Sequence, residues 1–361
     1  MEVLNCLKNI TTFEETKAKL QELNLIVKED SENDLYLVKY DKKTSDMSNV
    51  DVQKCRGLVA RKSDNRLVCL PPIKSETFDT TNDWSQVQVE DFIDGTNINV
   101  FYHNDKWFFS TRSNIGANCR WSSNKYFSEL FNESNNSINF DELDTTLFYS
   151  FVLLHPENII VTKYTVPTIV LISVGKNDNG TYMNIPLTNI KGYYGQIPFV
   201  HTFSNYMQAV DYVSKLDFQF QGLVLKYGSN FERRSKIRNS NYNYVKCLKG
   251  NTNNLKYVFL ESLQNKTTNE YLTFFPEYTN LFNEFNTELK TLVSNINNNY
   301  RLFHKKKAIS IQEIPFQYRR LCYEIHGLYM ENKQNVTYNI VYSYILSLPV
   351  PRILFAINYK S

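Results

Sequence analysis

The 361-residue chain has little glycine, few cysteines and histidines, and no long run of apolar residues. Its 11 glycines and 10 prolines are too few for a collagen-like or low-complexity chain. No apolar run approaches the roughly 20 residues of a membrane-spanning helix. The first residues also lack the basic stretch and apolar core of a secretory signal. We therefore expect a cytoplasmic, intracellular protein with no membrane partner.

The cysteines are scattered, with no Cys-x-x-Cys pair and no histidine at ligand spacing. They are Cys6, Cys55, Cys69, Cys119, Cys247 and Cys322. This spacing predicts free, buried thiols and supports neither a disulfide scaffold nor a zinc site. The five histidines form no cluster along the sequence, so the sequence offers no metal site.

Apolar residues make up 42% of the chain, enough to bury a core, and the length suggests two or three domains. Lysine and arginine number 40 against 37 acidic residues, a net charge of +3. This balance is too even to indicate a nucleic-acid partner by itself.

Two kinds of local pattern divide the chain near residue 250. Before it, a capped helix over 12–24 precedes short β-branched or aromatic runs that predict strands. These runs are 25–29, 35–40, 57–62, 98–102, 107–112, 159–164, 168–175 and 222–227, with one helix near 205–216 between them. We expect an α+β domain over residues 1–250.

After residue 250 the apolar residues recur at helical spacing. They include Leu281, Phe285, Leu289, Leu292 and Ile296, and later Ile340, Tyr344, Ile345 and Leu348. We expect an α-helical C-terminal domain over residues 251–361. The asparagine tract at 295–299 and the lysines at 305–307 are predicted as loops between helices, and His326 as a residue at a helix end.

Short motifs with polar residues lie in or next to the predicted strands. They are Cys55–Val59 with Arg56 and Gly57, Pro71–Lys74, Asp91–Thr96 with Asp94 and Gly95, and Ser110–Ser113 with Arg112. Each has an ordinary structural interpretation. Asp94 and Gly95 suit a hairpin turn, the two arginines suit solvated strand ends, and Lys74 suits a loop.

The order of these motifs resembles the nucleotidyltransferase domain of T4 RNA ligase 1-like proteins, in the covalent nucleotidyltransferase superfamily. Later segments fit the same order, at Phe151–Val161, Gln221–Leu225 and Ser235–Tyr242. The resemblance implies a ligase-type domain of antiparallel sheets over residues 1–250, followed by an all-α domain. Similar sequences look like proteins of giant viruses.

The resemblance also implies a chemistry whose key groups this sequence lacks. Ligases of this type use a lysine that attacks the α-phosphate of ATP, with carboxylates that hold Mg²⁺ and the ribose. The acceptor lysine falls at Phe92, the two carboxylates at Val152 and Gln221, and the second lysine of the last motif at Arg238. A phenyl ring cannot form a phosphoramidate.

The surviving residues favour binding over catalysis. We expect a catalytically degenerate RNA ligase-like protein that binds RNA, and ATP or GTP as a second ligand. The implied binding residues are Arg56, Lys74, Asp94, Gly95, Arg112, Gln221, Lys236 and Arg238. A basic cluster supports RNA binding and is interleaved with Tyr242 and Tyr244. It comprises Arg233, Arg234, Lys236, Arg238, Lys246 and Lys249. Solvated charges on a strand pair are the alternative.

Two other functions remain open. In the first, Lys74 takes over the nucleophilic role in an active ligase that uses ATP and Mg²⁺, although in-line attack tolerates little displacement of the amine. In the second, the protein is a structural scaffold whose partner is another protein. A covalent label from ATP would indicate the first, and a protein partner without a nucleotide-dependent thermal shift the second.

Overall fold

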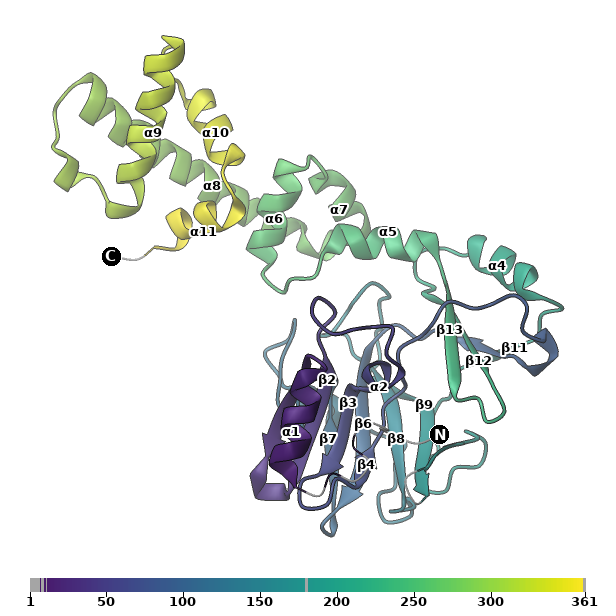
Figure 1. The fold of residues 1–361 in the computed structure, drawn as a ribbon. Helices are drawn as coiled ribbons and strands as arrows, with labels where there is room; N and C mark the ends of the chain where they lie inside the picture. The colour runs from purple at the N-terminus through teal and green to yellow at the C-terminus, as the bar shows by residue number, and fades with distance from the viewer. Residues whose placement is uncertain (1–6, 8–9, 11, 179–180, 360–361) are drawn as a thin grey trace. The chain divides into compact units, whose positions relative to one another are not determined.

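The computed structural model describes residues 7, 10, 12–178 and 181–359 (Figure 1). It divides into two compact units, Met1–Tyr244 and Val245–Ser361. The described strands form three antiparallel sheets in the first unit, and the second unit is helical in its described part. The predicted α+β class with a helical C-terminal region is therefore confirmed. Cys6 lies outside the described residues, and all described cysteines are free, with Cys247 exposed rather than buried.

The first sheet is a four-stranded meander that begins the chain. In order it contains β1 (Leu25–Asp30), β2 (Leu35–Tyr40), β3 (Arg56–Arg61) and β4 (Leu67–Cys69). Helix α1 (Phe13–Glu22) packs on it through Phe13 and Leu20 (Figure 1). The side chain of Thr12 accepts a hydrogen bond from the Glu15 amide, as expected of an N-cap. A short helix, α2 (Val50–Lys54), precedes β3.

The second sheet has five strands and two differently covered faces. Its order is β10 (Thr181–Ile185), β9 (Thr168–Asp178), β8 (Leu147–Leu154), β6 (Thr96–His103) and β7 (Lys106–Ser110). Helix α3 (Phe127–Ser134) covers one face, where Ile98 and Phe151 pack with its Phe131. On strands β6 and β8, Phe101 and Phe148 point the other way, because side chains alternate along a strand. They complete the core of the first sheet.

The third sheet joins strands that are distant in sequence. Its order is β11 (Val200–His201), β5 (Gln88–Asp91), β12 (Gly222–Tyr227) and β13 (Arg233–Arg238). Helix α4 (Tyr206–Ser214) covers one face, where Ala209 and Val213 pack with Leu223 and Leu225. Alternation along β12 therefore places Val224 and Lys226 on the opposite face. That face carries the functional side chains described below.

The second unit consists of helices that follow α5 (Ser240–Lys249), which crosses the boundary between the units. They are α6 (Leu255–Gln264), α7 (Thr268–Phe274), α8 (Thr279–Tyr300), α9 (Phe316–Asn332), α10 (Tyr338–Ser347) and α11 (Val350–Asn358). Within the described part of the chain, no single helix has the length and apolar character to cross a membrane. Helices α10 and α11 meet that test only as a pair, bent by 119° at their break.

Two predictions for this unit, one of a loop and one of a helix end, are wrong. The asparagine tract at 295–299 lies inside α8, because Leu289, Leu292 and Ile296 bury the same helical face. His326 lies in the middle of α9 rather than at its end. Its ring stacks on that of His304, with centroids 4.0 Å apart, so two of the histidines do come together in the fold.

Candidate functional site

The segment Phe92–Gly95 carries the chain from the third sheet to the second. Strand β5 pairs with β11 and β12, whereas β6 pairs with β7 and β8. The predicted hairpin at Asp94 and Gly95 is therefore wrong, because the flanking strands belong to different sheets. Gly95 is needed for a close approach. A Cβ atom there would lie 2.5 Å from the carbonyl oxygen of Leu153 on β8.

Phe92 lies against two cationic side chains of β13. Its backbone amide donates to the Gly222 carbonyl oxygen at 2.9 Å, which fixes the residue at the edge of β12. The Lys236 Nζ lies 3.9 Å from the centroid of the Phe92 ring, and the Arg238 Cζ lies 5.7 Å from it. Cations are attracted to the face of an aromatic ring at such distances. Phe92 thus positions two basic groups but supplies no nucleophile.

Strand β13 divides its basic residues between two faces. The Arg233 Nε donates to Glu76 at 2.7 Å on the side of Ser235 and Ile237, which are buried. Residues at even numbers, Arg234, Lys236 and Arg238, therefore share the opposite face. Of the basic cluster predicted from the sequence, this strand brings only three members to one side. Lys246 and Lys249 belong to the second unit.

Arg56 and Arg112 come from the first and second sheets and pack together. A Cβ atom on Gly57, whose φ is +94°, would lie 2.8 Å from the Arg112 Cα, so only glycine permits this approach. The Arg112 Nη2 donates to the Tyr40 carbonyl oxygen at 3.2 Å, and its Cζ lies 4.5 Å from the Tyr40 ring centroid. The Arg56 Nη1 donates to the Pro72 carbonyl oxygen at 3.2 Å.

These arginines and the β13 residues form one electrostatic cluster. Burial lowers the pKa of Arg56, and the charges of Arg112 and Arg238 lower it further, against an opposing effect of Tyr40. Burial also lowers the pKa of Arg234 to about 10, with a contribution from Arg56. Each charge disfavours its neighbours. We call Arg56, Arg112, Arg234, Lys236 and Arg238 the cationic face.

The cationic face has unused hydrogen-bonding capacity. The Nε atoms of Arg112 and Arg234 are buried and have no hydrogen-bond partner in the described structure. A buried donor without an acceptor is costly, and for a charged group the cost is larger. An anion bound here would supply the missing acceptors and offset the mutual repulsion of the cations.

The nearest carboxylate is already paired. Glu90 is buried on β5 and lies 2.7 Å from the Lys226 Nζ, while Gln88 Nε2 donates to it at 2.6 Å. Burial lowers the pKa of Lys226, and Glu90 opposes that shift. Its neighbour Asp91 points to the other face of β5, where its Oδ1 lies 2.7 Å from the His201 Nε2. Alternation of side chains along the strand thus leaves one carboxylate, that of Glu90, on the side of the cationic face.

Asp94 is a structural residue rather than an exposed ligand. Its Oδ2 accepts from the amides of Val161 and Thr162 at 3.0 and 2.9 Å, and its Oδ1 accepts from the Tyr242 hydroxyl at 2.6 Å. The strand predicted over 159–164 is wrong, because this β-branched run instead wraps its amides around the buried carboxylate. Tyr242 is fully buried, and burial together with Asp94 raises its pKa. It is no stacking surface for a base.

The two positions at which the family resemblance expects carboxylates, Val152 and Gln221, differ in their surroundings. Val152 is buried in a small apolar cluster with Leu154 and Ile93. Gln221 is 7% exposed, and its Oε1 has no hydrogen-bond partner in the described structure. It precedes Gly222, whose register partner on β13 is Arg238. Gln221 therefore lies immediately before β12, next to the residue that pairs with Arg238.

Lys74 belongs to a segment that runs beside the same strand. Its amide donates to the Gln53 carbonyl oxygen at 3.3 Å, and two residues later the Glu76 amide donates to the Arg234 carbonyl oxygen at 2.9 Å. A pocket next to Arg234 is lined by Pro72 and Lys226. No hydrogen bond or ion pair joins the Lys74 amine to another described residue.

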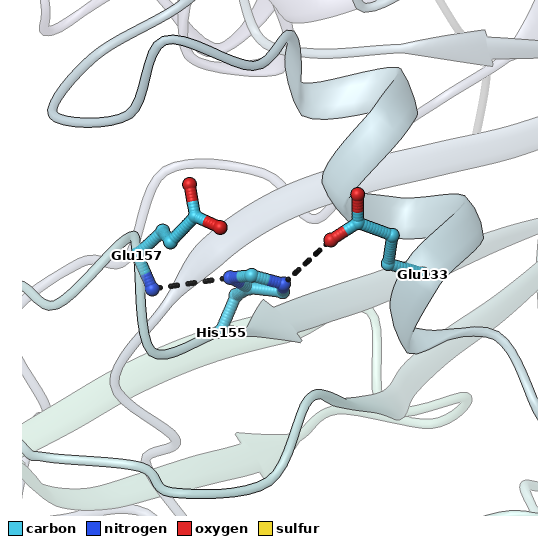
Figure 2. Close-up of side chains that lie close together, drawn as sticks. All are labelled: Glu133, His155 and Glu157. Carbon is cyan, nitrogen blue, oxygen red and sulfur yellow. Dashed lines mark hydrogen bonds and ion pairs between the residues drawn. The ribbon is translucent and has the colours of Figure 1, made fainter.

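A second cluster, Glu133, His155 and Glu157, has the donor atoms of a metal site (Figure 2). The Lys125 Nζ, however, lies 2.9 Å from Glu133 and 2.8 Å from Glu157. The His155 ring is also used on both sides. Its Nδ1 accepts from the Glu157 amide at 3.1 Å and its Nε2 lies 3.2 Å from Glu133. The lysine already compensates these carboxylates, so the cluster is an ion-pair network.

Sequence reasoning missed two members of the site. Tyr40 supports Arg112 with its ring and carbonyl oxygen, and Lys226 neutralises Glu90. The position of Lys226 could have been predicted, because it lies two residues after Val224 and so shares the face of β12 that α4 does not cover. The role of Tyr40 could not, because its contact with Arg112 joins residues far apart in the chain.

Comparison with known proteins gives distant structural likenesses. No protein-family model and no curated protein matches the chain. A putative ATP-dependent DNA ligase from Aquifex aeolicus shares 15% identity over 73% of this chain and 69% of its own, with a TM-score of 0.43. An archaeal ATP-dependent RNA ligase shares 11% identity over 96% of this chain and 76% of its own, with a TM-score of 0.41. A Naegleria gruberi RNA ligase with PPi shares 13% identity over 43% of this chain and 50% of its own, with a TM-score of 0.29.

All three solved structures are ligases by name, and each shares 15% identity or less with this chain. The function proposed below therefore depends on the residues of this chain alone.

Proposed function

We propose that this protein is a catalytically degenerate relative of T4 RNA ligase 1-like proteins that binds RNA phosphates at the cationic face. The observation that supports this most is the excess of positive charge there, with buried Nε atoms of Arg112 and Arg234 that lack an acceptor. Phosphate oxygens match guanidinium donors in charge and geometry. The phosphates of ATP or GTP would use the same donors.

The same site supports binding better than ligation. Covalent nucleotidyl transfer needs an amine at the acceptor position, and Phe92 instead offers a ring to Lys236 and Arg238. The groups expected to hold Mg²⁺ do not fit that role, because Val152 is apolar and Gln221 is neutral. We therefore propose no adenylylation step.

RNA binding by two matched variants of β13 tests the proposal. Lys236→Gln with Arg238→Gln removes two cations from the cationic face, whereas Arg233→Gln removes one from the opposite face of the same strand. For single-stranded RNA, each lost phosphate contact reduces the salt slope by about 0.7. We expect the double variant to lose affinity about tenfold or more and to show a shallower slope, with Arg233→Gln close to wild type. Absent or salt-independent binding by the wild type would refute the proposal.

A further inference from the structure

We infer that the cationic face takes its phosphate ligand free of Mg²⁺, in contrast to a site that binds a metal-chelated nucleotide. This inference rests on the proposed function and specifies the form of the ligand. Mg²⁺ usually reaches phosphates through one or two protein carboxylates. A metal-chelated phosphate would therefore need carboxylate oxygens near the cationic face that are not already bonded to protein groups.

The buried carboxylates around the face, Glu90 and Asp94, are occupied by protein donors. Glu90 forms its ion pair with Lys226, and Asp94 accepts from Tyr242 and from two backbone amides. Glu232, near the turn before β13, accepts from the Asn230 amide at 2.9 Å. A metal ion would have to displace these donors, several of which are buried.

Carboxylates beside these elements are turned to the opposite face of the third sheet. Glu76 accepts from Arg233 and from the Tyr227 hydroxyl at 2.8 Å, and Asp91 contacts His201. At the positions that the family resemblance assigns to metal-binding carboxylates, the chain has Val152 and Gln221. The site thus supplies cations and neutral groups where a metal requires anionic oxygens.

Charge favours the same conclusion. A bare triphosphate carries more negative charge than its Mg²⁺ complex, and a bound Mg²⁺ would lie among guanidinium and ammonium groups that repel it. Burial, and then the charges of Arg112 and Arg238, lower the pKa of Arg56, so the positive charges at this site already repel one another. The cations therefore neutralise the phosphates in the way that a metal ion does elsewhere.

Calorimetric titration with inorganic tripolyphosphate tests this directly. We expect binding in EDTA to be about tenfold tighter than binding in millimolar Mg²⁺, because the metal removes charge that the cationic face recognises. Equal or tighter binding with Mg²⁺, or no binding in either buffer, would overturn the inference. RNA binding by the same protein preparation decides the proposed function separately.

Gln221→Glu distinguishes this site from simple sequestration of the probe by Mg²⁺. The substitution keeps the side-chain volume and adds a carboxylate next to Gly222, the register partner of Arg238. We expect it to weaken metal-free binding several-fold and to reduce or reverse the difference between the two buffers. The matched control Gln86→Glu adds the same charge at an exposed position and should behave as wild type. If Gln221→Glu behaves as wild type, sequestration of the probe by Mg²⁺ explains the difference between the buffers and the inference is overturned.

Discussion

At the scale of single residues, Phe92 and Asp94 differ in what their side chains contact. Phe92 is half-buried and lies against the cationic face, whereas Asp94 is buried and bonded to the fold. The Phe92 ring supports Lys236 at a distance of 3.9 Å and remains part of the candidate site. Both carboxylate oxygens of Asp94, two residues later, accept hydrogen bonds from other residues of the fold. A position can therefore keep the residue expected of a motif and still serve only the structure.

Removal of the Tyr242 hydroxyl tests the structural role of Asp94. Tyr242→Phe leaves the buried Oδ1 without its 2.6 Å donor. A hydrogen bond to a charged group contributes about 2 kcal/mol, so we expect the free energy of unfolding to fall by about that amount. Urea denaturation measures it. Tyr244→Phe, at a side chain that is 52% exposed, should change stability by less than about 0.5 kcal/mol.

Sequence alone shows that Phe92, Val152 and Gln221 are neither the lysine nor the carboxylates that the family resemblance expects, because these residues can be read directly. It could not show how the remaining groups are used. The contact of Phe92 with Lys236 joins residues far apart in the chain, and so does the hydrogen bond between Asp94 and Tyr242. Such pairs depend on which strands share a sheet.

At the scale of elements, periodicity was reliable where one face of the element is buried. Strands such as β2 and β12 and helix α8 follow their apolar patterns. The run 159–164 has strand-like composition, but hydrogen bonding of its amides to Asp94 decides its conformation. The asparagines of α8 are weak helix formers, and packing of the buried face overrides that preference.

Two glycine substitutions test how closely the elements pack. A Cβ atom at Gly222, whose φ is +136°, would lie 2.1 Å from the Ile237 carbonyl oxygen, whereas a Cβ atom at Gly327 within α9 meets nothing within 4 Å. We expect Gly222→Ala to destabilise the protein by more than about 2 kcal/mol. Gly327→Ala should stabilise it by about 0.5–1 kcal/mol, since alanine favours a helix interior. Equal effects in urea denaturation would contradict this packing.

The π-helical turn Arg301–Lys305 should make the helical unit sensitive to acid. Burial, followed by the charge of His326, lowers the pKa of His304 from 6.5 to about 4. The unfolded chain binds a proton at this ring near pH 6.5, while the folded chain does so only near pH 4. The stability contributed by the neutral ring is therefore complete above the higher value and is lost as pH falls toward the lower one.

The measurement is the urea midpoint near pH 7 and near pH 5. We expect the wild type to lose more stability between these conditions than His304→Gln, which cannot take up the proton. An identical loss in both proteins would show that His304 does not control the response.

At the scale of the whole molecule, basic residues from all three sheets meet around one crossover. Arg56 comes from the first sheet, Arg112 from the turn after β7 of the second, and Lys236 from the third. The net charge of +3 conceals this concentration. The fold thus brings cations together in an arrangement suited to phosphates, beside a segment in which Phe92 supplies no nucleophile.

Incubation with ATP labelled at the α-phosphate, in the presence of Mg²⁺, tests the central claim most directly. The assay compares the wild type with Lys74→Ala after denaturing electrophoresis. We predict no covalently labelled band in either protein, because Phe92 cannot form a phosphoramidate and in-line attack tolerates little displacement of the amine to another position such as Lys74. A labelled band in the wild type that disappears in Lys74→Ala would contradict the account and establish an active enzyme with a relocated lysine.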